Sequence, residues 1–278
     1  MILSDAQRTH FVEKGFLVLK NAISPQLLSH LQQLSADLIA KKTQSPLSPD
    51  ELPAIALGKR GTQQYLTRIN NLFQFQPKLG ISLAQSSLQA VIEQLCTTPV
   101  LSVYESLVVK HPLDIHGFDW HRDMNAARED FVVTVGIYLD DSQAGQGALE
   151  VLSASHINDQ SVCDYKNALR KGTVTSSDVE ADAGDVVIHN VNLVHRSLPQ
   201  TQDSYRRTIY FEFRKASLIE TYPNFSPTWI QHRQQLNHFL TSEETMGQQA
   251  FTHFVNTILY REPVRFEAGE YCYEPNAT

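Results

Sequence analysis

Residues 131–139 read FVVTVGIYL, a nearly unbroken run of apolar and β-branched residues that predicts a β-strand. Residues 207–213 read RTIYFEF and alternate in character. Successive side chains of a strand point to opposite faces, so we expect this second strand to have one apolar and one polar face. The apolar face would carry Ile209, Phe211 and Phe213, and the polar face Thr208, Tyr210 and Glu212.

Further strands are expected on either side of these two. Residues 101–109, 148–152 and 185–189 are rich in apolar and β-branched residues, and glycine-containing turns precede the last two segments. Many short strands separated by turns are typical of a sandwich or a barrel. We place this barrel core at about residues 100–214.

Helices are expected before and after the strands. Residues 4–14, 24–39, 82–96 and 228–259 have helical patterns, and Ser24-Pro25 supplies a typical cap and first-turn proline. Helices first, strands in the middle and helices last indicate an α+β fold with a mainly β core. We interpret residues 1–278 as a single domain.

The composition argues against several classes of protein. A hydrophobic share of 42% and a charged share of 19% indicate a folded core and not a disordered chain. The net charge of -7 and the isoelectric point near 5.9 argue against nucleic acid or an anionic membrane as the main partner. No apolar run is long enough to span a bilayer, and the first residues lack the pattern of a signal peptide. We expect a monomer or homodimer that acts on a small molecule.

The three cysteines lie far apart in the sequence. Cys96, Cys163 and Cys272 form no CxxC pair, so a structural zinc site has no support. We therefore expect reduced thiols and a cytoplasmic location.

The segment Trp120-His121-Arg122-Asp123 carries the strongest chemical signal. Side chains two apart in an extended segment point the same way, so His121 and Asp123 can reach one metal ion. A distant histidine, His189 or His195, would complete two imidazoles and one carboxylate on one face of the metal. Such a set leaves the opposite face open and is typical of non-haem Fe(II) oxygenases. A lone HxD is weak evidence in a chain with 11 histidines.

An arginine after the second histidine would provide a counter-charge for a buried carboxylate. Arg206 and Arg207 are the candidates, and both lie at the start of the alternating strand. Adjacent strand residues face opposite sides, so only one of them can point into the barrel. A guanidinium binds a carboxylate through two parallel hydrogen bonds.

Together with other motifs, these residues point to a known family. The motifs include residues 3–7 (LSDAQ), 120–123 (WHRD), 148–156 (ALEVLSASH) and 183–189 (AGDVVIH). The chain resembles the phytanoyl-CoA dioxygenase (PhyH-like) family of Fe(II)/2-oxoglutarate-dependent oxygenases as far as about Arg214. The resemblance implies a double-stranded β-helix, which is a jelly-roll or cupin-like barrel, with supporting helices at both termini.

The resemblance also implies the reaction and its cofactors. They are Fe(II), 2-oxoglutarate as cosubstrate and O2, with succinate and CO2 released as a small metabolite or acyl compound is hydroxylated. Relatives that halogenate carry a small residue at the position of Asp123, so its presence favours hydroxylation. Two other hypotheses are a cupin-like metal-dependent isomerase or hydrolase that does not use 2-oxoglutarate, and a non-catalytic relative. We disfavour the latter because no metal ligand is missing.

The resemblance assigns the site residues. His121, Asp123 and His195 are the expected metal ligands and catalytic centre, because Arg206 follows His195 at the family's offset. Arg206 would bind the cosubstrate carboxylate, leaving His189 a supporting role and Arg207 an exposed strand end. Ser197 shares a face with His195 and is a candidate hydroxyl donor to the same carboxylate. Lys110, Thr134 and Tyr104 sit where the family lines the cosubstrate pocket.

Two segments are candidate lids. Residues 43–61 contain three prolines and two glycines and are expected to be a long loop, and residues 158–182 are expected to be a polar surface insertion. The basic residues Arg68, Lys59 and Arg60 near the first lid would favour a negatively charged substrate.

Overall fold

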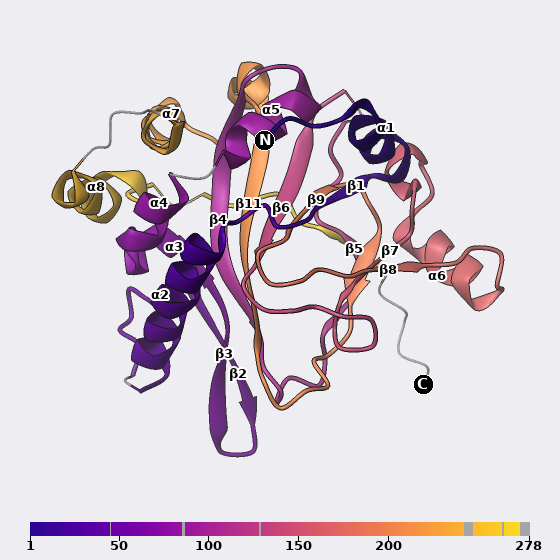
Figure 1. Ribbon diagram of the computed structural model, residues 1–278, viewed down its shortest axis with the longest axis horizontal. Helices are drawn as coiled ribbons and strands as arrows, with labels where there is room; N and C mark the ends of the chain where they lie inside the picture. The colour runs from indigo at the N-terminus through magenta and orange to yellow at the C-terminus, as the bar shows by residue number, and fades with distance from the viewer. Residues whose placement is uncertain (45, 85–86, 128, 242–246, 263, 273–278) are drawn as a thin grey trace.

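Two antiparallel sheets form the centre of the computed structural model, which describes residues 1–44, 46–84, 87–127, 129–241, 247–262 and 264–272 (Figure 1). The larger sheet has the strand order β1-β9-β6-β11-β4-β3-β2 and the smaller one β12-β5-β10-β7-β8. The larger sheet contains β1 (Phe16–Leu19), β2 (Ile55–Arg60), β3 (Gln63–Asn70), β4 (Val100–Lys110), β6 (Val132–Tyr138), β9 (Val186–Asn190) and β11 (Arg206–Lys215). The smaller sheet contains β5 (Phe118–Arg122), β7 (Leu149–Val151), β8 (Ser177–Val179), β10 (His195–Ser197) and β12 (Glu270–Tyr271). This architecture confirms the expected jelly-roll-like fold with a mainly β core.

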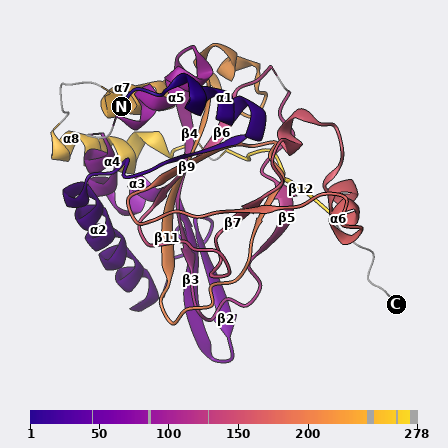
Figure 2. The same cartoon turned by 45° about the vertical axis from the view of Figure 1, so that its right-hand side comes forward.

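Helices cover the outer face of the larger sheet. In Figures 1 and 2, α2, α3, α4 and α8 lie on one side of this sheet, and the smaller sheet with α6 lies on the other. The helices are α1 (Asp5–Lys14), α2 (Pro25–Gln44), α3 (Leu72–Phe75), α4 (Pro77–Leu83), α5 (Leu88–Cys96), α6 (Val162–Arg170), α7 (Pro227–Thr241) and α8 (Gln248–Phe254). Shorter helical turns span Ser155–Ile157, Ala216–Thr221 and Val255–Leu259.

Strand β11 separates the apolar core from the inner side of the sandwich. Ile209, Phe211 and Phe213 belong to the main hydrophobic cluster beneath the helices. On the opposite face, Tyr210 and Glu212 line a cavity between the sheets. The predicted alternation of this strand is therefore confirmed, and it fixes which face of the larger sheet carries polar chemistry.

A glycine in β6 makes room for this chemistry. Gly136 pairs in register with Tyr210 on β11. A Cβ atom at Gly136 would lie 2.9 Å from Cε1 of Tyr210, which is closer than van der Waals contact allows. The missing side chain lets the Tyr210 ring lie over the inner face of the sheet.

The predicted long loop over residues 43–61 is wrong in its second half. Helix α2 continues to Gln44, and β2 then forms a hairpin with β3 that extends the larger sheet. Gly58 serves close packing here, because its Cβ would lie 2.3 Å from the Tyr65 ring. Gly61 turns the chain with φ of 61°. The glycines that suggested a loop therefore belong to a hairpin.

Two helix predictions and the polar insertion also need correction. The helix expected over 82–96 begins only at Leu88, after α4 has ended at Leu83. The helix expected over 228–259 is divided into α7, α8 and a π-turn. The insertion 158–182 contains α6, which starts at a reciprocal Ser161–Asp164 cap, and the short strand β8.

The chain returns to the smaller sheet near its C-terminal end. Strand β12 pairs with β5, where Glu270 is opposite Arg122 and Tyr271 is opposite His121. A disulfide joins Cys272 to Cys163 in α6, so the expectation of three reduced thiols is wrong for this pair. Cys96 is a free, buried thiol. Within the described residues, no helix combines the length and apolar character that crossing a membrane requires.

Candidate metal centre and active-site cavity

Neighbouring strands of the smaller sheet bring the three expected metal ligands together. His195 on β10 is opposite His121 on β5, and Asp123 follows the end of β5. Nε2 of His121 lies 3.5 Å from Oδ1 of Asp123, and Nε2 of His195 lies 3.6 Å from the same oxygen. All three ligand atoms lie within 4.8 Å of one another. The two distant segments of sequence therefore converge on one point.

Backbone carbonyls orient both imidazoles. Nδ1 of His121 is 2.7 Å from the carbonyl oxygen of Asp119, and Nδ1 of His195 is 2.9 Å from that of Leu193. A carbonyl oxygen only accepts a hydrogen bond, so each Nδ1 carries the proton and each Nε2 has a free lone pair. Both lone pairs are thus available to a metal ion, as is usual for metal-binding histidines.

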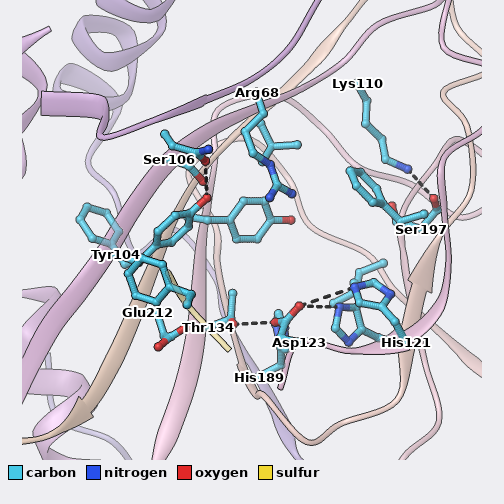
Figure 3. A pocket seen from close by; sticks show the side chains of 18 of the residues that line it. Arg68, Tyr104, Ser106, Lys110, His121, Asp123, Thr134, His189, Ser197 and Glu212 are labelled. Atoms are coloured by element: carbon cyan, nitrogen blue, oxygen red, sulfur yellow. Dashed lines mark hydrogen bonds and ion pairs between the residues drawn. The ribbon is translucent and has the colours of Figure 1, made fainter. Parts of the chain in front are cut away.

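Asp123 is held so that one oxygen remains available. Oδ2 accepts hydrogen bonds from Thr134 Oγ1 at 2.7 Å and from His189 Nε2 at 3.0 Å. Figure 3 shows Thr134, His189 and His121 gathered around this carboxylate. Because Oδ2 is occupied, Oδ1 is the oxygen that faces the two Nε2 atoms. His189 therefore contacts the carboxylate oxygen that faces away from the cluster, while His195 presents the third candidate ligand atom.

The site holds Asp123 and His195 in the protonation states that a metal requires. For His121, burial alone would lower the pKa, but the interaction with Asp123 outweighs burial and raises it. Burial alone would raise the pKa of Asp123, but the interactions with His195, His121 and His189 outweigh burial and hold it well below its ordinary value. Burial lowers the pKa of His195 to about 3, so this imidazole is neutral at pH 7. A carboxylate and a neutral imidazole are the ligating forms. The donor set and its one-sided arrangement fit Fe(II).

The three ligand atoms border a cavity of about 360 Å³ between the sheets. This volume is at the small end of the 300–1,000 Å³ typical of ligand sites. Residues from both sheets line it, among them Arg68, Asn70, Tyr104, Ser106, Lys110, Phe118, Thr134, Ser197, Arg206, Tyr210, Glu212, Phe266 and Glu267. The cavity therefore contains every residue that the sequence assigned to the metal or cosubstrate.

Arg206 is a buried cation without a carboxylate partner among the described residues. Its side chain donates from Nη1 to Ser142 Oγ and to the carbonyl oxygen of Gly147, both at 2.6 Å. Its Nε is buried and finds no hydrogen-bond acceptor within the described parts of the chain. A buried, incompletely paired guanidinium is costly, so its environment fits an anionic ligand.

Lys110 and Ser197 lie at the same end of the cavity. Lys110 is the register partner of Arg206, and its Nζ donates to the carbonyl oxygen of Ser197 at 2.8 Å. Burial, reinforced by the charge of Arg206, lowers the pKa of Lys110 to about 6. The Ser197 hydroxyl donates to the carbonyl oxygen of Gly147 at 2.9 Å, the acceptor that Arg206 also uses. Both residues thus lie next to the position that a carboxylate bound to Arg206 would occupy.

Thr134 and Tyr104 make contacts that the sequence did not predict. Thr134 bonds to Asp123, so it acts on the metal centre. Tyr104 donates its hydroxyl to Asn70 Oδ1 at 2.6 Å on another wall of the cavity. Both residues line the cavity, but neither hydroxyl points to Arg206 in the structure.

Arg207 is not the exposed strand end that the sequence suggested. It forms a two-pronged ion pair with Asp140, with Nη2 2.7 Å from Oδ1 and Nε 2.8 Å from Oδ2. It also donates to the carbonyl oxygen of Gln32 in α2. Arg207 therefore fastens the helical layer to the sheet, while Arg206 points to the other side of the strand.

Several residues that line the cavity or contact its lining had no signal in the sequence. Arg214 is fully buried and pairs with Glu212 at 2.7 Å and with Glu267 at 2.7 Å. Both carboxylates line the cavity opposite the smaller sheet's histidines. The C-terminal Glu267 and Tyr271 come from a segment with neither a periodic pattern nor a recognisable motif.

The comparisons with known proteins agree with this geometry. AviO1 from Streptomyces viridochromogenes Tue57 has a TM-score of 0.66 and 27% identity over 77% of this chain and 95% of its own. EvdMO1 has a TM-score of 0.65 and 30% identity over 75% of this chain and 49% of its own. EctD from S. alaskensis, solved with bound Fe, shares the fold with a TM-score of 0.63 at 19% identity, over 77% of this chain and 78% of its own.

The comparison with curated proteins gave no match. The family model described as "Phytanoyl-CoA dioxygenase (PhyH)" matches residues 11–208, which include the three metal-ligand candidates and Arg206. The chain therefore belongs to the phytanoyl-CoA dioxygenase (PhyH) family of non-haem Fe(II)- and 2-oxoglutarate-dependent oxygenases.

Proposed function

We propose that this oxygenase hydroxylates a small metabolite or acyl compound, with His121, Asp123 and His195 as the iron ligands. The observation that carries the proposal is the convergence of two Nε2 atoms and Oδ1 beside a cavity whose other end holds Arg206. Bound Fe(II) and 2-oxoglutarate would supply the oxidising chemistry, in which the cosubstrate is converted to succinate and CO2 as O2 is consumed.

The chain's residues position these components. The carbonyl oxygens of Asp119 and Leu193 keep the imidazoles turned toward the metal, and Thr134 and His189 keep Oδ1 of Asp123 free. The carboxylate occupies a ligand position that a halide would need, which favours hydroxylation.

Arg206, Lys110 and Ser197 are the proposed binding residues for the distal carboxylate of 2-oxoglutarate. The unsatisfied Nε of Arg206 supplies a donor, and Lys110 supplies a second cation once it takes up a proton. Thr134 acts through Asp123 and not on the cosubstrate. Tyr104 belongs to the part of the cavity left for the substrate.

The size of the cavity favours a small substrate. A volume of about 360 Å³ must hold the cosubstrate as well as the reacting part of the substrate. We expect a monomer or homodimer. The cytoplasmic location expected from the sequence remains a prediction, and the Cys163–Cys272 disulfide weighs against it.

The test is cosubstrate turnover. Purified protein supplied with Fe(II), O2 and 2-oxoglutarate should form succinate, and Asp123→Ala should reduce this rate at least 100-fold while the protein stays folded. Asp119→Asn is the matched control, because that side chain pairs with Lys166 and only its backbone carbonyl contacts His121. If 2-oxoglutarate neither reacts nor stabilises the Mn(II)-loaded protein against heat, the cupin-like isomerase or hydrolase becomes the better hypothesis.

A further inference from the structure

Arg68 is a second arginine in the active-site cavity, distant in sequence from the cosubstrate residues. It lies on β3, where it pairs in register with Val108 on β4. Figure 3 shows its side chain reaching into the cavity, with the guanidinium between Tyr104 and the His121–Asp123 cluster.

The Arg68 guanidinium contacts a ring but no anion. Its Cζ lies 5.8 Å from the centre of the Phe118 ring. Within the part of the chain that the structure describes, it has no hydrogen-bond or ion-pair partner. Apart from Arg206, the other inward or half-buried arginines of the described residues pair with carboxylates, namely Arg122, Arg196, Arg207, Arg214 and Arg233.

Charge balance indicates that Arg68 and Arg206 bind different anions. Fe(II) and Arg206 together carry three positive charges. The Asp123 carboxylate and a 2-oxoglutarate dianion together carry three negative charges, which balance them. The loaded centre is therefore neutral while Lys110 is neutral and carries one positive charge once Lys110 takes up a proton. In both cases Arg68 adds a further positive charge that no carboxylate among the described residues pairs with. A half-buried charge in a cavity between two sheets is less well solvated than one on the surface, which favours an anionic ligand.

The nearest polar neighbours of Arg68 are suited to the same ligand. Asn70 lies two residues along β3, on the same face, and is opposite Ser106 on β4. Because Tyr104 donates to Oδ1 of Asn70, the remaining capacity of this amide is mainly that of an N–H donor. A guanidinium and an amide N–H together match the oxygens of a carboxylate or phosphate.

Two acidic residues, Glu212 and Glu267, also line the cavity, but they favour a cationic substrate less strongly than Arg68 favours an anionic one. Glu212 and Glu267 both pair with the buried Arg214. Burial also raises the pKa of Glu212. Arg214 compensates one of these two negative charges, and the raised pKa of Glu212 reduces the other. Both carboxylates thus already have a guanidinium partner, whereas Arg68 has no carboxylate partner among the described residues.

We propose that Arg68, assisted by Asn70, binds a carboxylate or phosphate group of the substrate and so holds the carbon to be oxidised against the metal centre. This proposal rests on the proposed oxygenase function and names the substrate class of that same site. The small cavity limits the bound portion to a compact organic anion.

Paired probes test the proposal without knowledge of the natural substrate. We would titrate protein loaded with Mn(II) and 2-oxoglutarate with hexanoate against hexanamide, and with phenyl phosphate against phenol, and measure thermal stabilisation and heat of binding. At least one anion should bind ten-fold or more tightly than its neutral counterpart. A preference for hexanoate over hexanamide would indicate a carboxylate site, and a preference for phenyl phosphate over phenol would indicate a phosphate site.

Two variants assign the effect. Arg68→Gln should abolish the preference for the anion. Arg60→Gln removes the same charge from an exposed position on the same hairpin and should preserve the preference. Equal binding of anion and neutral probe by the wild type would overturn the proposal, as would equal losses in the two variants.

A third measurement tests whether Arg68 contributes to binding of the cosubstrate. Binding of 2-oxoglutarate to the Mn(II)-loaded Arg68→Gln protein should stay within about three-fold of wild type. A larger loss would mean that Arg68 serves the cosubstrate, and the substrate proposal would be wrong. If 2-oxoglutarate fails to bind the wild type, the oxygenase function itself fails, which is a different result.

Discussion

The ring of Tyr271 stacks on the imidazole of His121, with ring centres 5.0 Å apart and planes 2° from parallel. The stack is held in place by β12, since Glu270 pairs with Arg122 at 2.7 Å and accepts from the backbone of Val162 at 2.8 Å. The C-terminal segment thus covers one face of a metal ligand. This contact joins the end of the described chain to the catalytic centre.

Replacing Tyr271 should weaken metal binding. An aromatic pair contributes about 0.5–1.5 kcal/mol beyond buried area. Tyr271→Ala should therefore raise the dissociation constant for Mn(II) by about two- to ten-fold, measured by calorimetry, and Tyr271→Phe should stay close to wild type. Equal losses in both variants would assign the effect to the hydroxyl instead of the ring.

Two threonines on the inner face of the larger sheet should respond differently to loss of their hydroxyls. Thr134 bonds to Asp123, whereas the buried Thr208 hydroxyl has no hydrogen-bond partner among the residues that the structure describes. Thr134→Val should weaken Mn(II) binding by about ten-fold, in line with other residues that support metal ligands. Thr208→Val should leave metal affinity unchanged and should not lower the melting temperature.

Substitution of the two adjacent arginines of β11 should affect different properties, namely cosubstrate binding for Arg206 and stability for Arg207. Arg206→Gln should weaken 2-oxoglutarate binding by about 10- to 100-fold, because it removes charge-assisted hydrogen bonds, while stability changes by less than about 1 kcal/mol. Arg207→Gln leaves Asp140 without its ion-pair partner and should cost about 3 kcal/mol of unfolding free energy. Calorimetric binding and urea unfolding of both variants measure these effects. A stable Arg207→Gln protein with impaired cosubstrate binding would contradict the assignment.

Binding of 2-oxoglutarate should take up a proton through Lys110. Its pKa of about 6 leaves it mostly neutral at pH 7.5, and an adjacent carboxylate raises that pKa. Affinity should therefore fall as the pH rises above about 6, and the binding enthalpy at pH 7.5 should depend on the ionisation enthalpy of the buffer. Below pH 6 the amine is already protonated and the uptake should disappear. Lys110→Met should remove the buffer dependence; its persistence would implicate another group.

Reduction of the disulfide should destabilise the protein. Cys163 and Cys272 are 109 residues apart, and the chain-entropy estimate for a loop of that size is about 4–5 kcal/mol. Dithiothreitol should lower the melting temperature of the wild type and weaken its hold on Mn(II). The double variant Cys163→Ser/Cys272→Ser should be equally destabilised and insensitive to reductant. A wild type indifferent to reductant would argue that the bond does not support the fold.

The sequence predicted the parts of the molecule that local patterns encode. The strand at 131–139 corresponds to β6, and the alternation of residues 207–213 correctly assigned the two faces of β11. The spacing of His121 and Asp123, together with the family resemblance that selected His195, predicted the cluster that the structure assembles. These signals are local or rest on a compact motif, so they survive without knowledge of the tertiary structure.

The remaining features depend on contacts between distant segments. Nothing near Glu267 or Cys272 in the sequence indicates that they meet Arg214 and Cys163. The hairpin containing Gly58 was misread because close packing against Tyr65, which requires glycine, looks the same in sequence as a flexible loop. Arg207 was assigned to solvent because its partner Asp140 lies on another segment.

The late position of β12 also constrains how the enzyme is made. Glu270 and its partner Arg122 are 148 residues apart, so the ribosome finishes β5 long before it supplies the strand that flanks it. Contacts of such long range form slowly because the intervening loop must first close. In the nascent chain, the edge of β5 beside His121 therefore remains without its partner strand until the ribosome has translated β12. Until β12 pairs with β5, His121 lacks the aromatic ring that covers one of its faces, so iron bound earlier would meet a less sheltered imidazole.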